Sequence, residues 1–109
     1  MQEMINTSIE TEEKPRKISP NNVYYWAEQE GILVGSQKSK AKKFLEKGCV
    51  QYQGEGQWKV LPIIGYNKTT HEVDMLNRTC KCQFFRKTGS DCSHIKAVEL
   101  KIFMDKWNN

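Results

Sequence analysis

The segment CKCQFFRKTGSDCSH, residues 80–94, contains four side chains of the kinds that bind zinc: Cys80, Cys82, Cys92 and His94. Cys80 and Cys82 are two positions apart, so in an extended strand both thiols project to the same side. Cys92 and His94 have the same spacing, where a final helix is expected to begin. Three sulfurs and one imidazole complete the tetrahedral shell of a structural zinc ion. The spacing therefore predicts one closed zinc site.

The start of that final helix favours the same site. Asp91 is of a type that caps helix N-termini, and the positive end of the helix dipole favours the thiolate form of Cys92. The alternative is that the cysteines are ordinary buried thiols or a disulfide pair. A disulfide between Cys80 and Cys82 is disfavoured because side chains at i and i+2 are badly placed for S–S geometry. A metal site is the preferred interpretation.

The rest of the sequence indicates a reducing compartment. The first residues, MQEMINTSIETEEK, lack an apolar stretch of signal-peptide length, and no apolar run approaches the ~20 residues that cross a bilayer. We therefore expect a cytoplasmic protein (nuclear if the source is eukaryotic) with no membrane partner, in which cysteines bind metal. Cys49 is expected to be a small buried apolar residue, and His71 a surface or strand-end residue rather than a ligand.

Periodicity elsewhere predicts helices around a small sheet. Ser19-Pro20 is typical of a helix start and Gly31 of its end, and a second helix is expected over residues 36–47. Alternating apolar residues then predict three strands, near residues 50–52, 58–66 and 73–80, before a final helix over about 91–107.

The fold class that follows is α+β. We expect a small zinc-stapled domain, with a three-stranded antiparallel meander followed by a C-terminal helix and one or two N-terminal helices packed on it. The chain divides into a flexible tail at 1–18, a helical region with a lysine-rich helix at 19–47, and a zinc-binding module at 48–109.

The C-x-C and C-x-H pairs resemble those of the SWIM zinc finger. The resemblance extends to the strands at residues 58–60 and 71–75 and to the start of the final helix, and covers roughly residues 48–100. It implies a compact ββα-type module associated with DNA binding and protein–protein contacts. It also implies the metal ligands Cys80, Cys82, Cys92 and His94. Gln83 departs from the pattern, because many members have a proline or a small residue there.

The charged residues are unevenly distributed. Residues 1–13 hold four of the 13 acidic residues and none of the 17 basic ones, so the remainder has nine acidic residues and a formal charge of +8. That balance favours an anionic partner such as nucleic acid. Two candidate contact surfaces are the lysine-rich helix and the aromatic and basic segment between the ligand pairs; alternatively, both are merely solvated faces. The candidate contacts are Lys38, Lys40, Lys42, Lys43, Arg78, Lys81, Phe85, Arg86 and Lys87.

The final helix has apolar residues on two sides. One side can pack on the sheet, and the other must meet either the N-terminal helices or another chain. We expect Phe103 and Trp107 to be largely buried within the chain, against Tyr24 or Trp26. The same two residues are the candidate interface for a protein partner or a second copy of the chain.

Two functions remain open at this point. The first is binding of nucleic acid, DNA more than RNA, mainly through phosphates and with a structural zinc ion. The second is a protein–protein adaptor in a larger nucleoprotein complex. An enzyme is not expected, because the sequence shows no nucleophile–base pair, no phosphate-binding loop and no clustered carboxylates.

Overall fold

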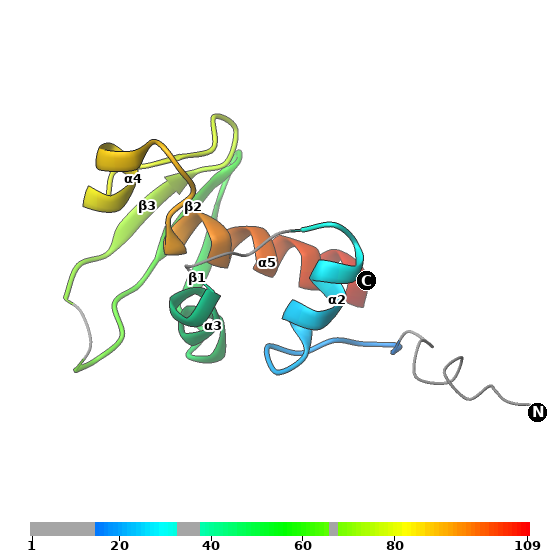
Figure 1. Cartoon of the computed structure of the whole chain (residues 1–109). Helices are drawn as coiled ribbons and strands as arrows, with labels where there is room; N and C mark the ends of the chain where they lie inside the picture. The colour runs from blue at the N-terminus through cyan, green and yellow to red at the C-terminus, as the bar shows by residue number, and fades with distance from the viewer. Residues whose placement is uncertain (1–14, 33–37, 66–67) are drawn as a thin grey trace, which may run out of the picture.

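The computed structural model describes residues 15–32, 38–65 and 68–109 (Figure 1). Its elements, in chain order, are helices α2 (Val23–Gln29) and α3 (Lys38–Glu46), strands β1 (Val50–Gly54), β2 (Gln57–Val60), β3 (His71–Asp74) and β4 (Thr79–Cys80), and helices α4 (Gln83–Thr88) and α5 (Ser93–Asn108). The strands form one antiparallel sheet in the order β1-β2-β3-β4. The α+β class is confirmed, with one strand more than predicted. Among the described residues, no helix has the length and apolar character needed to cross a membrane.

The predicted third strand is in fact two strands joined by a tight turn. Asp74 ends β3, because its Oδ1 accepts hydrogen bonds from the backbone N–H groups of Leu76 at 2.9 Å and Asn77 at 3.3 Å. Arg78 then adopts a left-handed backbone conformation, with φ of 55°, and the chain returns as β4 to pair with β3. Alternating apolar residues could not distinguish one long strand from this hairpin. The reversal places Cys80 at the free edge of the sheet.

The second strand is shorter than predicted. β2 ends at Val60, ahead of Pro62, which has no backbone N–H for a sheet hydrogen bond. Residues 61–63 follow without regular structure and Ile64 is fully exposed. Tyr66, expected in the same strand, lies outside the described residues.

Helix α2 begins later than predicted. Ser19-Pro20 forms a turn instead of a helix start: the backbone N–H of Asn22 donates to the Ser19 carbonyl at 3.1 Å, and the backbone N–H of Ser19 donates to Asn22 Oδ1 at 2.9 Å. Asn22 is the residue at the N-cap position, and the helix follows it. The predicted buried side is confirmed, and consists of Val23, Tyr24, Trp26 and Ala27.

Helix α5 is the centre of the packing. It contacts α2, α3 and all four strands, and Figure 1 shows it running from the sheet past α3 to α2. Ile95, Val98 and Leu100 are completely buried on it. The prediction that the N-terminal helices pack on the C-terminal helix is therefore confirmed. The N-terminal end of α5 lies beside β4, which brings the two halves of the cysteine–histidine segment together.

Candidate zinc centre and basic surface

The four predicted metal ligands form one cluster. Cys80 ends β4, Cys82 precedes α4, Cys92 precedes α5, and His94 lies in the first turn of α5. One ligand atom from each of the four lies within 4.8 Å of all the others, and all four residues are buried. Three separate elements thus converge on one point, as a tetrahedral site requires.

The distances within the cluster fit a zinc ion. His94 Nδ1 lies 3.7 Å from Cys80 Sγ and 3.6 Å from Cys92 Sγ. With Zn–S bonds of ~2.3 Å and a Zn–N bond of ~2.0 Å, a tetrahedral angle separates sulfur and nitrogen by about 3.5 Å. The side chains are therefore already spaced as the ligands of one ion, with Nδ1 as the nitrogen that faces it.

The electrostatics of the cluster also fit a cation. The hydrogen bond between Cys80 and Cys92 lowers the pKa of Cys80 and raises the pKa of Cys92 to about 12. Burial raises the pKa of Cys82. Three buried thiols at this separation cannot all ionise alone, because each thiolate disfavours the next. A divalent ion supplies the positive charge that makes three thiolates stable together.

Local backbone structure positions the cysteines. Cys82 is the N-cap of α4 and its sulfur accepts the backbone N–H of Phe85 at 3.5 Å, a contact that supports a thiolate ligand. Cys92, rather than the predicted Asp91, is the N-cap residue of α5. The Asp91 carboxylate instead accepts hydrogen bonds from Arg78. The predicted loop between the ligand pairs is also partly helical, as α4.

His71 was expected at the surface or at a strand end. It does begin a strand, but its side chain also lies against the zinc cluster. It is the first residue of β3, as expected, but its ring stacks on that of His94, with centroids 3.9 Å apart and planes at 24°. Its Nδ1 is buried without a hydrogen-bond partner in the described part of the chain. His71 therefore covers one face of a predicted ligand without joining the cluster. Its alternation with buried Val73 along one strand was the signal that it faces inward.

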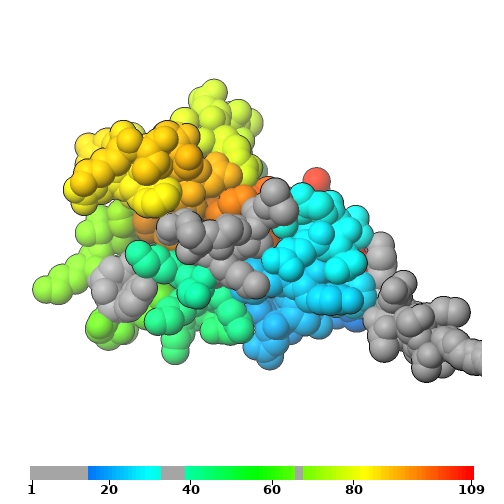
Figure 2. All heavy atoms as spheres, in the orientation of Figure 1, coloured from blue at the N-terminus to red at the C-terminus, as the bar shows by residue number. Residues whose placement is uncertain are grey.

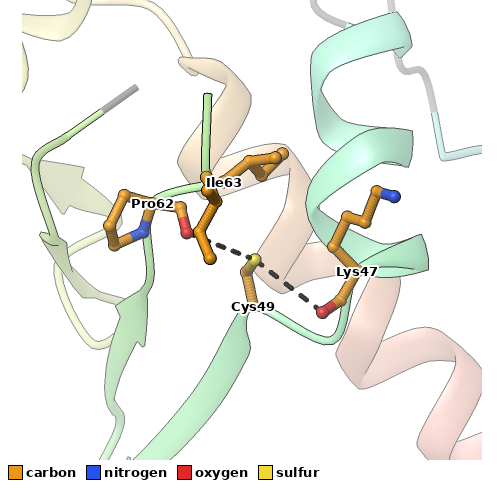
Figure 3. A pocket seen from close by; sticks show the side chains of 5 residues that line it. Lys47, Cys49, Pro62 and Ile63 are labelled. Carbon is orange, nitrogen blue, oxygen red and sulfur yellow. Dashed lines mark hydrogen bonds between the residues drawn. The ribbon is translucent and has the colours of Figure 1, made fainter. Parts of the chain in front are cut away.

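Cys49 lies apart from the cluster, as predicted. It is 7% exposed and burial raises the pKa of its thiol. Figure 3 shows it between the end of α3 and the segment after β2, with its sulfur 3.9 Å from the carbonyl oxygens of Lys47 and Pro62. A mostly apolar hollow of about 320 Å³ opens beside it, lined also by Ile63 and Ile64. The interpretation of Cys49 as a small buried residue is confirmed.

The lysines of α3 lie at the surface. Lys40 and Lys43 are exposed, as is Lys47 just beyond the helix. Lys42 is half-buried and pairs with Glu46 at 3.7 Å. The side chain of Lys38 lies outside the described part of the structure. The opposite side of α3 is buried through Ala41, Phe44 and Leu45, as predicted.

The second basic group surrounds α4. Lys81, Arg86 and Lys87 are all exposed. Figure 2 shows α4 and α3 on the same face of the molecule. Of the two aromatic residues, Phe85 packs against the core and Phe84 is 37% exposed. One phenylalanine in the core was expected, and the exposed ring is Phe84, not the predicted contact Phe85.

A polar hollow of about 340 Å³ lies between the start of β3 and α4, beside the zinc cluster. Two of the predicted basic contacts, Lys81 and Arg86, line it together with the hydroxyls of Thr69 and Thr70. One carboxylate, that of Glu72, also lines it. The hollow therefore offers several hydrogen-bond donors next to the structural centre of the module.

Arg78 has partners within the protein. Its guanidinium donates to the carboxylates of Asp91, at 2.6 Å, and Glu99, at 2.9 Å. Burial raises the pKa of Asp91, but its hydrogen bonds and charge interaction with Arg78 lower it by more, so the pKa lies below its usual value. The charge of Arg78 is therefore already balanced by two carboxylates of the protein. The prediction that Arg78 contacts nucleic acid had treated this charge as available to a phosphate.

Phe103 and Trp107 were expected to be largely buried, but both are only half-buried on α5. Trp107 packs on Trp26 with ring centroids 5.9 Å apart, and its Nε1–H donates to the Pro15 carbonyl at 3.0 Å. The predicted packing of Trp107 against α2 is confirmed. The use of these residues by a partner or a second copy stays a prediction.

Comparison with known proteins identifies the module. A family model of the SWIM zinc finger matches residues 63–103, which include β3, β4, α4, the four clustered ligands and most of α5. No curated protein and no solved structure matches the chain. The matched segment and the geometry of Cys80, Cys82, Cys92 and His94 lead to one conclusion. This chain carries a SWIM zinc finger.

Proposed function

We propose that this protein binds nucleic acid, DNA in preference to RNA, mainly through backbone phosphates, and that its zinc ion is structural. The observation that carries the proposal is the shared face of α3 and α4 (Figure 2). These two elements are distant in the sequence, and they and the residues beside them carry exposed basic side chains, those of Lys40, Lys43, Lys47, Lys81, Arg86 and Lys87. Phosphate contacts supply most non-specific affinity for nucleic acid.

The zinc site contributes by shaping this face. Four protein ligands fill a tetrahedral shell and leave no position for water or substrate, so the ion would act by holding the fold. Lys81 lies between two of the ligands, and Arg86 lies on the helix that Cys82 caps. The polar hollow beside Cys82 would then accept a phosphate between Lys81, Arg86 and the two threonines.

A salt titration tests the proposal. Each phosphate neutralised on duplex DNA adds roughly 0.9 to the magnitude of the slope of log K against log[salt]. Engagement of three to five of the bases would therefore give a slope of about −3 to −4.5 for a random duplex, with affinity in the micromolar class. The measurement is fluorescence anisotropy of labelled duplex DNA, single-stranded DNA and RNA across a range of salt concentrations.

A matched pair of variants locates the surface. Lys40→Glu with Lys43→Glu should weaken binding to all sequences alike and flatten the slope by about 1.8, because phosphate contacts position without specifying sequence. Lys17→Glu with Lys106→Glu makes the same charge change at exposed positions near the C-terminal end of α5. This pair should retain the salt dependence of the original protein. Equal losses of nucleic-acid affinity in the two double variants would mean that only the net charge of the protein matters.

An adaptor role is the second candidate, and exposed apolar side chains favour it. Ile64 is 100% exposed, Leu76 74% and Tyr52 60%; single exposed apolar residues are common on protein surfaces, but a protein partner that covered several of them would bury apolar area. If no nucleic acid binds above the level of an unrelated protein of equal charge, the nucleic-acid proposal is wrong and the adaptor role replaces it.

A further inference from the structure

The two halves of the zinc site are joined by an ion-pair network outside the cluster. Arg78 lies two residues before Cys80, and Asp91 lies directly before Cys92. The guanidinium of Arg78 binds Asp91 through both Nε and Nη2, with N···O distances of 3.1, 3.2 and 2.6 Å. A side-chain contact thus connects the backbone on either side of the metal cluster.

Two residues of α5 complete the network. Arg78 Nη2 also lies 2.9 Å from Glu99 Oε1, and Lys96 Nζ lies 3.5 Å from Asp91 and 3.3 Å from Glu99. The side chains of Asp91, Glu99 and Lys96 are 25%, 23% and 14% exposed, so water screens them less than ordinary surface pairs. Two cations and two anions alternate, and the forked contact of Arg78 fixes its orientation.

Cys80 lies on the shortest strand of the sheet. β4 has only two residues, and its ladder with β3 joins Val73 to Cys80 and Asp74 to Thr79. Arg78 itself is held at φ of 55°, a conformation that is unfavourable for a long side chain unless its surroundings fix it. The bonds of Arg78 to Asp91 and Glu99 supply such a constraint, and they do so from the element that carries Cys92 and His94.

We propose that Arg78 is the positioning residue of the zinc centre: its contacts with Asp91 and Glu99 align the Cys80–Cys82 pair with the Cys92–His94 pair before the metal binds. The proposal gives Arg78 a role other than the nucleic-acid contact predicted from its charge, and it is independent of whether the protein binds nucleic acid. Outer-shell partners of metal ligands typically change metal affinity by about 10–100-fold when they are removed. A loss in that range is expected here.

The test is zinc affinity of the full chain, measured by competition with a chelator. Arg78→Met keeps an unbranched side-chain stem at the left-handed position but removes the guanidinium and with it the network, and should raise the zinc Kd by about 10–100-fold. Arg16→Met is the matched control, because it removes the same charge from an exposed position outside the zinc-binding module, and should leave the Kd within about twofold. Arg78→Lys should fall between, because lysine cannot form the forked contact.

General loss of stability must be separated from positioning, because zinc binding and folding are coupled. Met104→Ala destabilises the far part of α5, and its effect on zinc Kd calibrates that coupling. If Arg78 positions the ligands, Arg78→Met should weaken zinc binding more than Met104→Ala does for the same loss of folding free energy. It should also alter the absorption bands of the Co²⁺-substituted protein, which report ligand geometry. Equal effects, or an unchanged cobalt spectrum with Kd within twofold of the original, would overturn the proposal. If Arg78→Met does not fold, Glu99→Gln and Arg78→Lys provide the same comparison.

Discussion

Trp107 provides a direct test of how the N-terminal part of the chain is held on α5. Its indole packs on Trp26 and Phe103, with centroid distances of 5.9 and 5.7 Å, and its Nε1–H donates to the Pro15 carbonyl at 3.0 Å. Beside it, Asn108 exchanges two hydrogen bonds with the backbone of Ile18, at 2.9 and 3.0 Å. The replacement Trp107→Ala removes the ring and its hydrogen bond together, whereas Trp107→Phe removes mainly the hydrogen bond.

The size of the effect follows from the burial of the ring. A tryptophan buries ~150–250 Å² in a core, and Trp107 is half-buried, so roughly 100 Å² of apolar surface is lost on truncation. At ~25 cal/mol per Å² this costs about 2.5 kcal/mol. The hydrogen bond adds about 1 kcal/mol. Trp107→Ala should therefore lower the free energy of unfolding by about 3.5 kcal/mol, and Trp107→Phe by about 1 kcal/mol.

The assay is urea denaturation of the zinc-loaded protein, followed by circular dichroism. Lys106→Ala is the control, because Lys106 is exposed and directly precedes Trp107 on α5, and a surface substitution of this kind should cost under about 0.5 kcal/mol. A loss below about 1 kcal/mol for Trp107→Ala would refute the docking of residues 15–29 on α5. Equal losses for the two Trp107 variants would instead assign the whole effect to the hydrogen bond and refute the estimate from burial.

Two further predictions concern the cysteines. Cys49→Ala should retain one zinc per chain by elemental analysis, whereas Cys92→Ser should lose the metal and the fold of the C-terminal half; loss of zinc from Cys49→Ala would contradict the assignment of the ligands. Because the pKa of Cys92 is raised to about 12 and that of Cys82 is raised as well, zinc must displace their protons, so zinc affinity should rise with pH and fall in acid. About three protons should be released per zinc bound near pH 7, as calorimetry in buffers of different ionisation enthalpy can measure; a value near one would exclude three thiolate ligands.

The zinc ligands could be predicted from the sequence because their signal is local. Cys80 and Cys82, like Cys92 and His94, are paired at a spacing of two, and each pair belongs to a single strand end or helix start. The buried sides of α2 and α3 were also predictable, since helical periodicity depends only on nearby residues. His71 was less clear, because its stacking on His94 depends on the pairing of β3 with the rest of the sheet.

The turn at residues 74–78 and helix α4 were missed for different reasons. Asp74 forms its turn through side-chain hydrogen bonds. The surrounding residues alternate as in a strand, so the apolar pattern predicted one continuous strand instead of a turn. Helix α4 has six residues, too few for a periodic signal. Gly89, with φ of 70° at its C-cap, was the only local mark of its end.

The role of Arg78 could not be predicted from the sequence at all. Its partners Asp91 and Glu99 lie 13 and 21 positions away, and a charge pattern cannot show which carboxylates the fold will bring to a given arginine. In the sequence Arg78 resembled a member of the basic cluster around the zinc ligands. Only the packing of β4 beside the start of α5 shows that its charge is balanced within the protein.

X-ray absorption spectroscopy at the zinc edge of the purified full chain, combined with metal analysis, tests most directly whether Cys80, Cys82, Cys92 and His94 hold one zinc ion. We expect one zinc per chain with three sulfur ligands at ~2.3 Å and one nitrogen at ~2.0 Å. Cys49→Ala should give the same spectrum. Two sulfurs with added oxygen ligands, or a shell that includes a bound water, would contradict a closed site formed by Cys80, Cys82, Cys92 and His94.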